Sequence, residues 1–67
     1  GENMPYINLQ ITKGASREQK KIIVEQMTKT LVDVLDKKPE HIHIVIEEID
    51  GDNWGFNGML TSDYRGE

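Results

Sequence analysis

The sequence predicts an α/β (α+β) protein built from two strands, a helix that joins them and a C-terminal hairpin. Three observations predict this class. Residues 6–11 and 41–49 alternate between apolar and polar side chains, a period of two that is typical of strands. Between them, residues 17–36 space apolar side chains three or four positions apart, as in an amphipathic helix. A helix of about twenty residues between two strands allows a parallel β-α-β unit with a right-handed crossover.

The first strand and the helix each have clear limits in the sequence. Gly14 ends the strand, and Ser16 with Gln19 matches the capping box that begins a helix. Pro39 stops the helix. The predicted apolar stripe of the helix comprises Ile23, Met27, Leu31, Val34 and Leu35, and it is widened by Ile22, Val24 and Val32. We expect this wider stripe to reach a second subunit.

The second strand, predicted over residues 41–49, places Ile42, Ile44 and Ile46 on one face. One helix covers one face of a two-stranded sheet, so the other face is expected to meet another subunit. After Ile49, the glycine-rich "DGDNWGFNGML" predicts a turn leading into a short hairpin or coil. The final "TSDYRGE" is expected to be loose or used in assembly.

The composition restricts the class of protein further. The chain has 67 residues, no cysteine and a formal net charge of −4. A domain this small buries only about 60% of its unfolded surface and usually needs disulfides, a metal or partner subunits. Disulfides are excluded, so we expect self-association. The acidic balance argues against nucleic acid, no apolar run approaches the roughly 18 residues of a membrane span, and the lack of cysteine fits a cytoplasmic location.

Met4 stands directly ahead of Pro5, which indicates the natural start of translation. We therefore expect residues 1–4 to be three added residues and an initiator methionine, and residues 5–67 to form a single domain. Removal of Met4 would give Pro5 a free secondary amine. Burial beside apolar groups lowers the pKa of an amine, and an amine with a pKa near the working pH is a useful general base. Proline at the start of a strand is otherwise ordinary.

Other side chains are weaker candidates. His41 and His43 share a predicted strand face, but no third ligand lies nearby in the sequence, so no metal site is expected. His43 alone suits a proton donor or an anion contact, because histidine changes charge near neutral pH. Trp54, on a tight glycine-rich loop, can form the wall of a pocket or anchor a core or interface. Arg17 opposes the helix dipole, which favours a role as an anion contact.

The loop that contains Trp54 also has a superficial likeness to a calcium site. In "DGDNWG" the fifth position of such a loop is Trp54 and the twelfth is Thr61, where the pattern requires Asp or Asn and Glu. A calcium site is therefore not expected. The residues alone lead no further than an oligomeric β-α-β domain.

The chain resembles the 4-oxalocrotonate tautomerase family from Pro5 to about Leu60. The resemblance rests on Met-Pro at the start, the helix entry "GASREQK" and the loop "NWGFNG". It implies a tautomerase-like fold in which two subunits form a four-stranded sheet, assembled as a homodimer or homohexamer. It further implies an enol–keto tautomerase for small enol or unsaturated 2-keto acids, with Pro5 as general base and then acid and no cofactor. Trp54 falls at the aromatic position of the site wall.

Two arginines that the resemblance implies are missing, because Ala15 and His43 occupy their positions. Arg17 and His43 are candidate replacements for contacting the anionic substrate, although histidine lacks the bidentate fork of arginine. Two alternatives stay open. A superfamily relative can use the same proline for hydration, dehalogenation or decarboxylation, or the protein can be a non-catalytic, oligomeric ligand-binding protein. With residues 1–4 attached, the Pro5 nitrogen is an amide, and we expect such a chain to be almost inactive.

Overall fold

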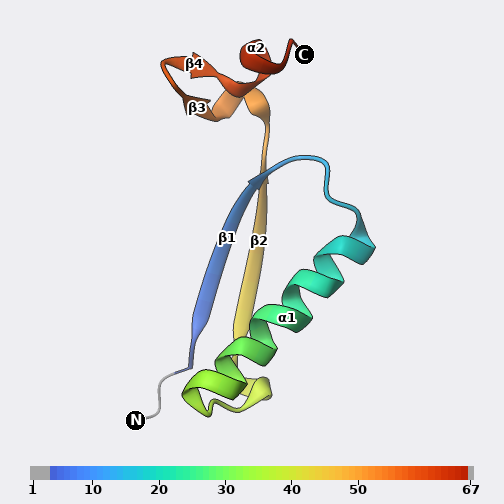
Figure 1. The fold of residues 1–67 in the computed structure, drawn as a ribbon, viewed down its shortest axis with the longest axis vertical. Coiled ribbons are helices and arrows are strands. Elements are labelled where there is room, and N and C mark those ends of the chain that lie inside the picture. The colour runs from blue at the N-terminus through green and yellow to red at the C-terminus, as the bar shows by residue number, and fades with distance from the viewer. Residues whose placement is uncertain (1–3, 67) are drawn as a thin grey trace.

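The computed structural model describes residues 4–66. Its strands and long helix are β1 (Tyr6–Thr12), α1 (Arg17–Leu35) and β2 (His43–Ile49). Shorter elements follow, namely β3 (Gly55–Phe56), β4 (Met59–Leu60) and α2 (Thr61–Arg65), and two 3-10 turns, η1 (Pro39–His41) and η2 (Gly51–Asn53), flank β2. Strands β1 and β2 lie side by side with α1 beside them, and the C-terminal elements lie beyond one end of this pair (Figure 1). The predicted β-α-β unit with a C-terminal hairpin is confirmed.

Strands β1 and β2 pair in parallel over their full length, from Tyr6 opposite His43 to Thr12 opposite Ile49. Burial alternates along both strands as the sequence predicts, since Ile7 and Ile44 are half-buried while Tyr6 and His43 are exposed. One face of the sheet therefore holds the apolar side chains and the other carries mostly polar ones.

The predicted capping box begins α1. The Ser16 hydroxyl accepts a hydrogen bond from the Gln19 N–H at 3.1 Å, and the Gln19 side chain accepts one from the Ser16 N–H at 2.9 Å. The helix ends at Leu35, one residue before the predicted limit, because Asp36 adopts the left-handed conformation with φ of 54°. The Asp36 N–H then donates to the Val32 carbonyl at 3.0 Å and closes the last turn.

The apolar stripe of α1 is covered only in part. Ile23 and Leu31 are half-buried, whereas Val34 is 73% exposed and Leu35 is 53% exposed. Val34 lies only about 20° around the axis from Ile23, so helical rotation does not explain its exposure. The last turn carries the apolar pattern of a buried face, but the part of the chain that the structure describes does not bury it.

The prediction that the second strand begins at His41 is wrong. Pro39–His41 forms the turn η1, in which the His41 N–H donates to the Lys38 carbonyl at 2.9 Å, and β2 begins at His43. The fixed φ of Pro39 suits the first position of such a turn. His41 and His43 consequently do not share a strand face.

The C-terminal arm, residues 50–66, contains the predicted hairpin. Strands β3 and β4 pair antiparallel, with Gly55 opposite Leu60. Asn57 and Gly58 connect them with φ of 55° and 74°, the two positive angles that a type I′ turn requires and that Asn-Gly adopts readily. Of the two alternatives predicted for the last residues, a loose segment is wrong, because Thr61–Arg65 forms α2, which ends at the left-handed Gly66, and a role in assembly stays a prediction.

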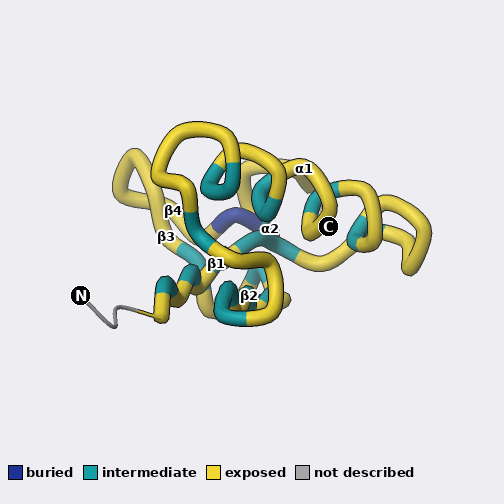
Figure 2. Tube along the Cα trace, turned by 90° about the horizontal axis from the view of Figure 1, so that it is seen from below, coloured by how far each residue is buried: buried dark blue, intermediate teal, exposed yellow. Residues whose placement is uncertain are grey.

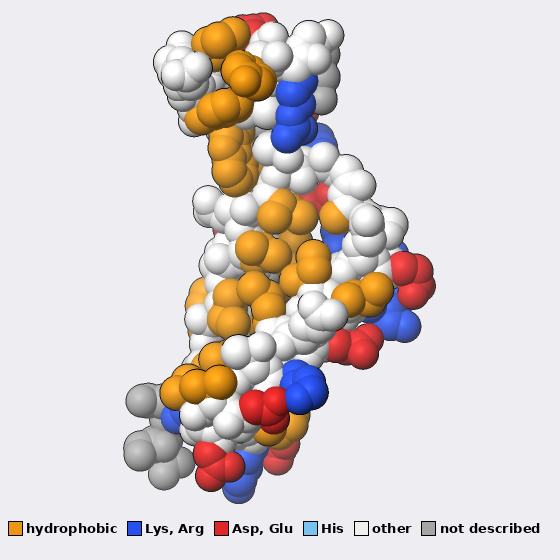
Figure 3. Space-filling view, in the orientation of Figure 1, with side chains coloured by type: hydrophobic (Ala, Val, Ile, Leu, Met, Phe, Trp, Pro, Cys, Tyr) orange, Lys and Arg blue, Asp and Glu red, His pale blue; other side chains and the backbone are white. Residues whose placement is uncertain are grey.

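The described chain does not close around a core of its own. No hydrophobic residue among 4–66 is fully buried, and most of the trace is exposed or half-buried (Figure 2). The radius of gyration is 15.3 Å, where a compact domain of this length would have about 11 Å. Hydrophobic side chains are gathered over the arm and continue down the middle of the same face (Figure 3). Within residues 4–66, no helix combines the length and hydropathy that crossing a bilayer requires.

Candidate active site

Pro5 and His43 lie together where the two parallel strands begin. The Pro5 carbonyl accepts a hydrogen bond from the His43 N–H at 3.0 Å, and the next residue, Tyr6, is directly opposite His43 in the strand register. Pro5 itself is half-buried, and the His43 side chain is on the open face of the sheet. Strand pairing thus brings together two of the four predicted site residues.

The open face of the sheet next to this pair carries an amide–carboxylate network. The Asn8 side-chain amide donates to the Glu47 carboxylate at 2.7 Å, and the Gln10 amide reaches the same oxygen at 3.4 Å. Asn8 also lies 3.4 Å from the Tyr6 hydroxyl. The face expected to meet another subunit is therefore polar along most of its length, with Val45 as an exposed apolar exception.

Trp54 lies at the opposite end of the sheet from Pro5. It follows η2, beyond the C-terminal end of β2, and the strand ends are well separated in the view along the shortest axis (Figure 1). Its carbonyl accepts two hydrogen bonds from Thr61, one from the N–H and one from the hydroxyl, each 2.8 Å long. Seven residues of β2 span roughly 20 Å at the rise of a parallel strand, so Trp54 does not approach Pro5 of its own chain.

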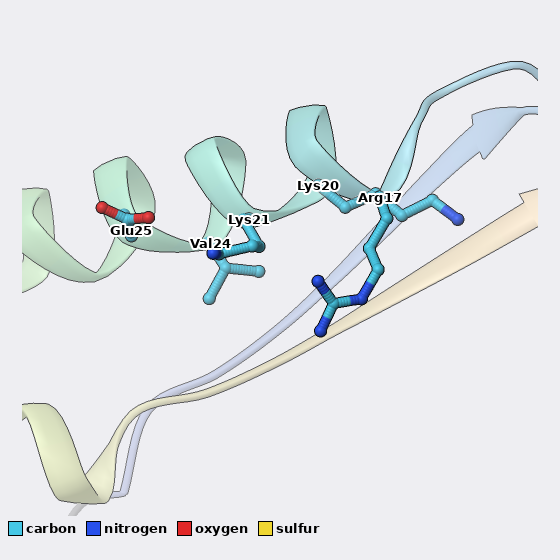
Figure 4. Close-up of a pocket in the computed structure, with 5 residues that line it drawn as sticks. All are labelled: Arg17, Lys20, Lys21, Val24 and Glu25. Atoms are coloured by element: carbon cyan, nitrogen blue, oxygen red, sulfur yellow. The ribbon is translucent and has the colours of Figure 1, made fainter.

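Arg17 is the first residue of α1, which begins after the carboxyl end of β1. It lines an open groove of about 340 Å³ together with Lys20, Lys21, Val24 and Glu25 (Figure 4). The groove is separate from the Pro5–His43 pair within one chain. Of the predicted site residues, then, Arg17 and Trp54 stand apart from Pro5 and from each other.

Ala15, where the family resemblance implies an arginine, lines a second hollow next to the start of α1. This hollow of about 420 Å³ is formed with Gln19, Ile22 and Ile23. No cationic side chain is among these four residues. The position that would carry a guanidinium is therefore the edge of a mainly apolar depression.

An acidic side chain at the end of β2 contacts α1, and Asp50, the first residue of the arm, contacts the segment after β1. Glu48, on the carboxyl end of β2, pairs with Lys20 of α1 and accepts a hydrogen bond from the Gly14 N–H. The Lys20 hydrogen bond, with a smaller contribution from Gly14, lowers the pKa of Glu48 below its ordinary value of 4.5. Asp50 accepts from the Asp52 N–H at 2.9 Å.

That hydrogen bond to Asp50 lowers the pKa of its carboxyl, and the Lys13 ammonium, at 3.4 Å, lowers it further. Asp50 stands at the first position of the arm, directly before η2. The root of the arm is thus held by charge-assisted hydrogen bonds between exposed groups.

Thr61 is the one fully buried residue within 4–66, with 2% of its surface exposed, and its burial was not predicted from the sequence. A local signal was present in the sequence that follows it. Asp63 in the first turn, Arg65 in the last and Gly66 just after form the charge and capping pattern of a short helix. The double hydrogen bond from Thr61 to the Trp54 carbonyl joins residues seven positions apart, and no sequence pattern indicated it.

Within residues 4–66, no three His, Cys, Asp or Glu side chains gather closely enough to hold a metal ion. The two histidines belong to different elements, since His41 is in η1 and His43 begins β2. The groups available for chemistry at the strand start are therefore the Pro5 nitrogen and the His43 imidazole. In this chain the Pro5 nitrogen is an amide bonded to Met4.

Comparison with known proteins gives a consistent result. The model of a family described as "Tautomerase enzyme" matches residues 5–64. The protein named Probable tautomerase K2 of Dickeya dadantii is 41% identical over 63 residues, covering 92% of this chain and 94% of the relative. 2-hydroxymuconate tautomerase of Comamonas testosteroni is 30% identical over 60 residues, covering 90% and 95%.

A solved structure agrees with these sequence matches. The crystal structure of DmpI from Helicobacter pylori superposes with a TM-score of 0.85 at 30% identity, covering 94% of this chain and 98% of that one. The relatives are about the same length as this chain, so each match spans the whole fold and not a part of it. On this evidence the chain belongs to the tautomerase family, as its resemblance to the 4-oxalocrotonate tautomerases predicted.

Proposed function

We propose that this protein is an enol–keto tautomerase acting on small enol or unsaturated 2-keto acids, with Pro5 as the proton carrier once it is N-terminal. Membership of the tautomerase family supports isomerase activity in general. The observation that carries the more specific proposal is that the family match begins at Pro5 itself. Residues 5–67 as a single domain, processing at Met4 and a cytoplasmic location belong to the same proposal.

The proposed chemistry needs one basic nitrogen. The free Pro5 amine takes the hydroxyl proton of the enol as the carbonyl forms, and the resulting ammonium returns a proton to the carbon that gains it. The amine is restored at the end of each cycle, so the protein itself supplies both the base and the acid. The pyrrolidine ring and the hydrogen bond from His43 to the Pro5 carbonyl hold the nitrogen in a fixed place.

The proposed site requires more than one chain. Pro5 and Trp54 are at opposite ends of the sheet, so Trp54 can form a wall of the Pro5 pocket only if it comes from a neighbouring copy. Self-association also accounts for the missing core, because a domain with no fully buried hydrophobic residue must find its apolar contacts elsewhere. We propose a homodimer or a homohexamer, with two chains forming a four-stranded sheet.

The proposed substrate carries a carboxylate. The Comamonas testosteroni relative is named for 2-hydroxymuconate, and this chain has Ala15 and His43 where the family resemblance implies arginines. His43, next to Pro5, and Arg17 of a neighbouring copy are the proposed anion contacts. The same two replacements favour the second candidate function, in which the Pro5 amine serves hydration, dehalogenation or decarboxylation.

The test compares forms of the protein that begin at Pro5. Ketonisation of phenylenolpyruvate, followed by ultraviolet absorbance, should fall by about 10²-fold or more in Pro5→Ala, because that variant replaces the rigidly held ring amine by a primary amine that is not held by a ring. Pro39→Ala, which changes the other proline of the chain, should keep most of the activity. The form that retains residues 1–4 should be nearly inactive, since its nitrogen is an amide.

Equal rates for the Pro5 start and Pro5→Ala would remove Pro5 from the mechanism. Halide release from haloacrylates without ketonisation would replace the tautomerase assignment by the second candidate function. Full retention of Met4 on protein made in the cell, measured by mass spectrometry, would favour a non-catalytic ligand-binding protein.

A further inference from the structure

The groove on the first turns of α1 has an unusual balance of charge. Three of its five lining residues, Arg17, Lys20 and Lys21, are cations, and they line it together with Val24, which is 36% exposed. Figure 4 shows the Arg17 side chain reaching away from the helix, and Lys21 next to Val24. Glu25 lines the same groove one residue beyond Val24.

Two of the three cations have no anionic partner within residues 4–66. Lys20 is bound to Glu48, and elsewhere Lys29 is bound to Asp33 at 2.5 Å. Arg17 and Lys21 make no ion pair in the described part of the chain. Their charges therefore face solvent over an open groove.

The position of these two cations is unfavourable for the helix itself. The first turn of a helix carries partial positive charge, so the cation of Arg17 is slightly destabilising there, whereas Lys21 lies beyond that turn. Arg17 and Lys21 are also four residues apart, which places like charges side by side on one face. Lys38, just beyond the C-terminal end of α1, is by contrast a cation near the negative end of the helix dipole, where positive charge is stabilising. An anion in the groove would remove both penalties at once.

We infer that Arg17 and Lys21 together bind the carboxylate of the substrate, while Val24 contacts its apolar part. Lys21 is then the second cation of the anion site, beside Arg17. A volume of about 340 Å³ accommodates a small acid with a short chain or one ring. Glu25, in the same groove, disfavours a second carboxylate by like-charge repulsion. The groove therefore selects monocarboxylates over dicarboxylates.

This inference rests on the proposed function, because the groove must meet the Pro5 of another copy for the bound acid to react. Arg17 follows the carboxyl end of β1 and Pro5 precedes its other end, so one chain cannot supply both. The binding step itself does not depend on the reaction. It can be measured with an unreactive acid.

The probe is 3-phenylpropanoate, titrated into the form that begins at Pro5 and followed by amide chemical shifts. We expect saturable shifts over residues 17–25 and a dissociation constant roughly three- to tenfold higher in Lys21→Gln, which loses one exposed charge-assisted contact. Lys38→Gln removes the same charge beyond the other end of α1 and should bind like the parent. Lys21→Arg keeps the positive charge and should bind the probe like the parent. Muconate, a dicarboxylate, should bind more weakly than 3-phenylpropanoate. In Glu25→Gln the difference in affinity between these two acids should be smaller.

Enzyme kinetics give a second readout. In Lys21→Gln the KM for phenylenolpyruvate should rise while kcat changes little, because the contact is made equally in the bound substrate and the transition state. If Pro5-dependent turnover is intact but Lys21→Gln and Lys38→Gln have the same KM and the same affinity for the probe, the groove assignment is wrong and the proposed function stands. If the probe binds as expected but Pro5→Ala is as active as the parent, the proposed function is wrong and the anion site remains.

A second copy of the chain is the competing occupant of the groove. An acidic side chain of a neighbour could neutralise Arg17 and Lys21 in place of a substrate. Dissociation of the assembly in Lys21→Gln, measured by sedimentation velocity, together with no shift on adding 3-phenylpropanoate, would assign the groove to that contact and overturn the inference.

Discussion

The β-α-β unit and the C-terminal arm use opposite means to hold their shape. In the unit, long-range strand pairing and half-buried apolar side chains organise residues far apart in the sequence. In the arm, the backbone is held by hydrogen bonds between residues close in the sequence. The Thr61 hydroxyl donates to the Trp54 carbonyl, and the Asp52 N–H donates to the Asp50 carboxylate. The buried residue of the arm is the polar Thr61, and several of the arm's large apolar side chains are exposed.

The apolar side chains that the arm displays are numerous for its size. Its exposed large hydrophobic residues are Phe56, Met59, Leu60 and Tyr64, and the rings of Phe56 and Tyr64 contact each other in a tilted arrangement with their centroids 4.9 Å apart. A segment that is locally rigid and apolar outside is suited to bind another protein surface with little loss of entropy. In the assembly that we propose, the unit supplies Pro5 and the arm supplies a contact to the next copy.

The largest effect should come from exchanging the two regions between chains. Pro5→Ala and Trp54→Ala, each almost inactive alone, are refolded together from the Pro5 start. If the pocket joins Pro5 of one copy to Trp54 of another, about a quarter of the sites in a random pairing contain both native residues, and activity returns to a comparable fraction. A mixture no more active than either variant alone would mean that the site does not combine Pro5 of one chain with Trp54 of another. The proposed division of the site between the unit and the arm would then be wrong.

A smaller but clear effect is expected on assembly. Met59 and Leu60 are each 42% exposed, so covering the rest of each side chain contributes about 1 kcal/mol. Met59→Ser/Leu60→Ser should raise the dissociation constant roughly 30-fold in sedimentation equilibrium. Val34→Ser/Leu35→Ser makes the matched change on α1. If the α1 pair dissociates the assembly and the arm pair does not, the helix and not the arm is the main contact.

The internal order of the arm should depend on one hydroxyl. Thr61→Val keeps the shape of the buried side chain but removes its hydrogen bond to the Trp54 carbonyl, at a cost of about 1 kcal/mol in the free energy of unfolding. Hydrogen exchange should quicken within residues 50–66. Thr30→Val is the control, because the Thr30 hydroxyl donates to the Gln26 carbonyl on an exposed helix surface. An equal loss of unfolding free energy in both variants would mean that the burial of Thr61 does not make its hydrogen bond more important than an exposed one.

The smallest effect concerns the contact between the end of β2 and the start of α1, and it depends on pH. The pKa of Glu48 is lowered by the Lys20 hydrogen bond, so its contribution to stability is complete above the ordinary value of 4.5 and is lost as pH falls through the lowered value. Asp50 adds a loss in the same direction from its ordinary value of 3.8. The melting temperature of Glu48→Gln should decline less steeply below pH 4.5 than that of the parent.

Glu40→Gln is the matched control for that titration, since it changes an exposed carboxylate elsewhere on the surface. Its melting curve should follow the parent through the acid range. Parallel curves of melting temperature against pH for Glu48→Gln and the parent would show that the acid stability of the protein does not depend on this carboxylate.

Much of the fold was predictable because its signals are local. The capping box at Ser16 and Gln19, the alternation of β1 and the Asn57–Gly58 turn each need only a few neighbouring residues to act. The predictions failed where a local pattern was overridden by another constraint on the backbone or by a contact between more distant residues. A period of two continues through His41, but the fixed φ of Pro39 determines the backbone there, and the order of α2 depends on the buried contact between Thr61 and Trp54.

The candidate site was predictable only as a set of residues. The sequence by itself determined that Pro5 precedes a strand, that an apolar-striped helix follows and that so short a chain is a marginal domain on its own, because these depend on residue type, spacing and length. The tertiary structure decided which residues meet. Parallel pairing puts His43 beside Pro5, and the same parallel direction sends Trp54 to the far end of the sheet, because a crossover connection starts both strands at one edge.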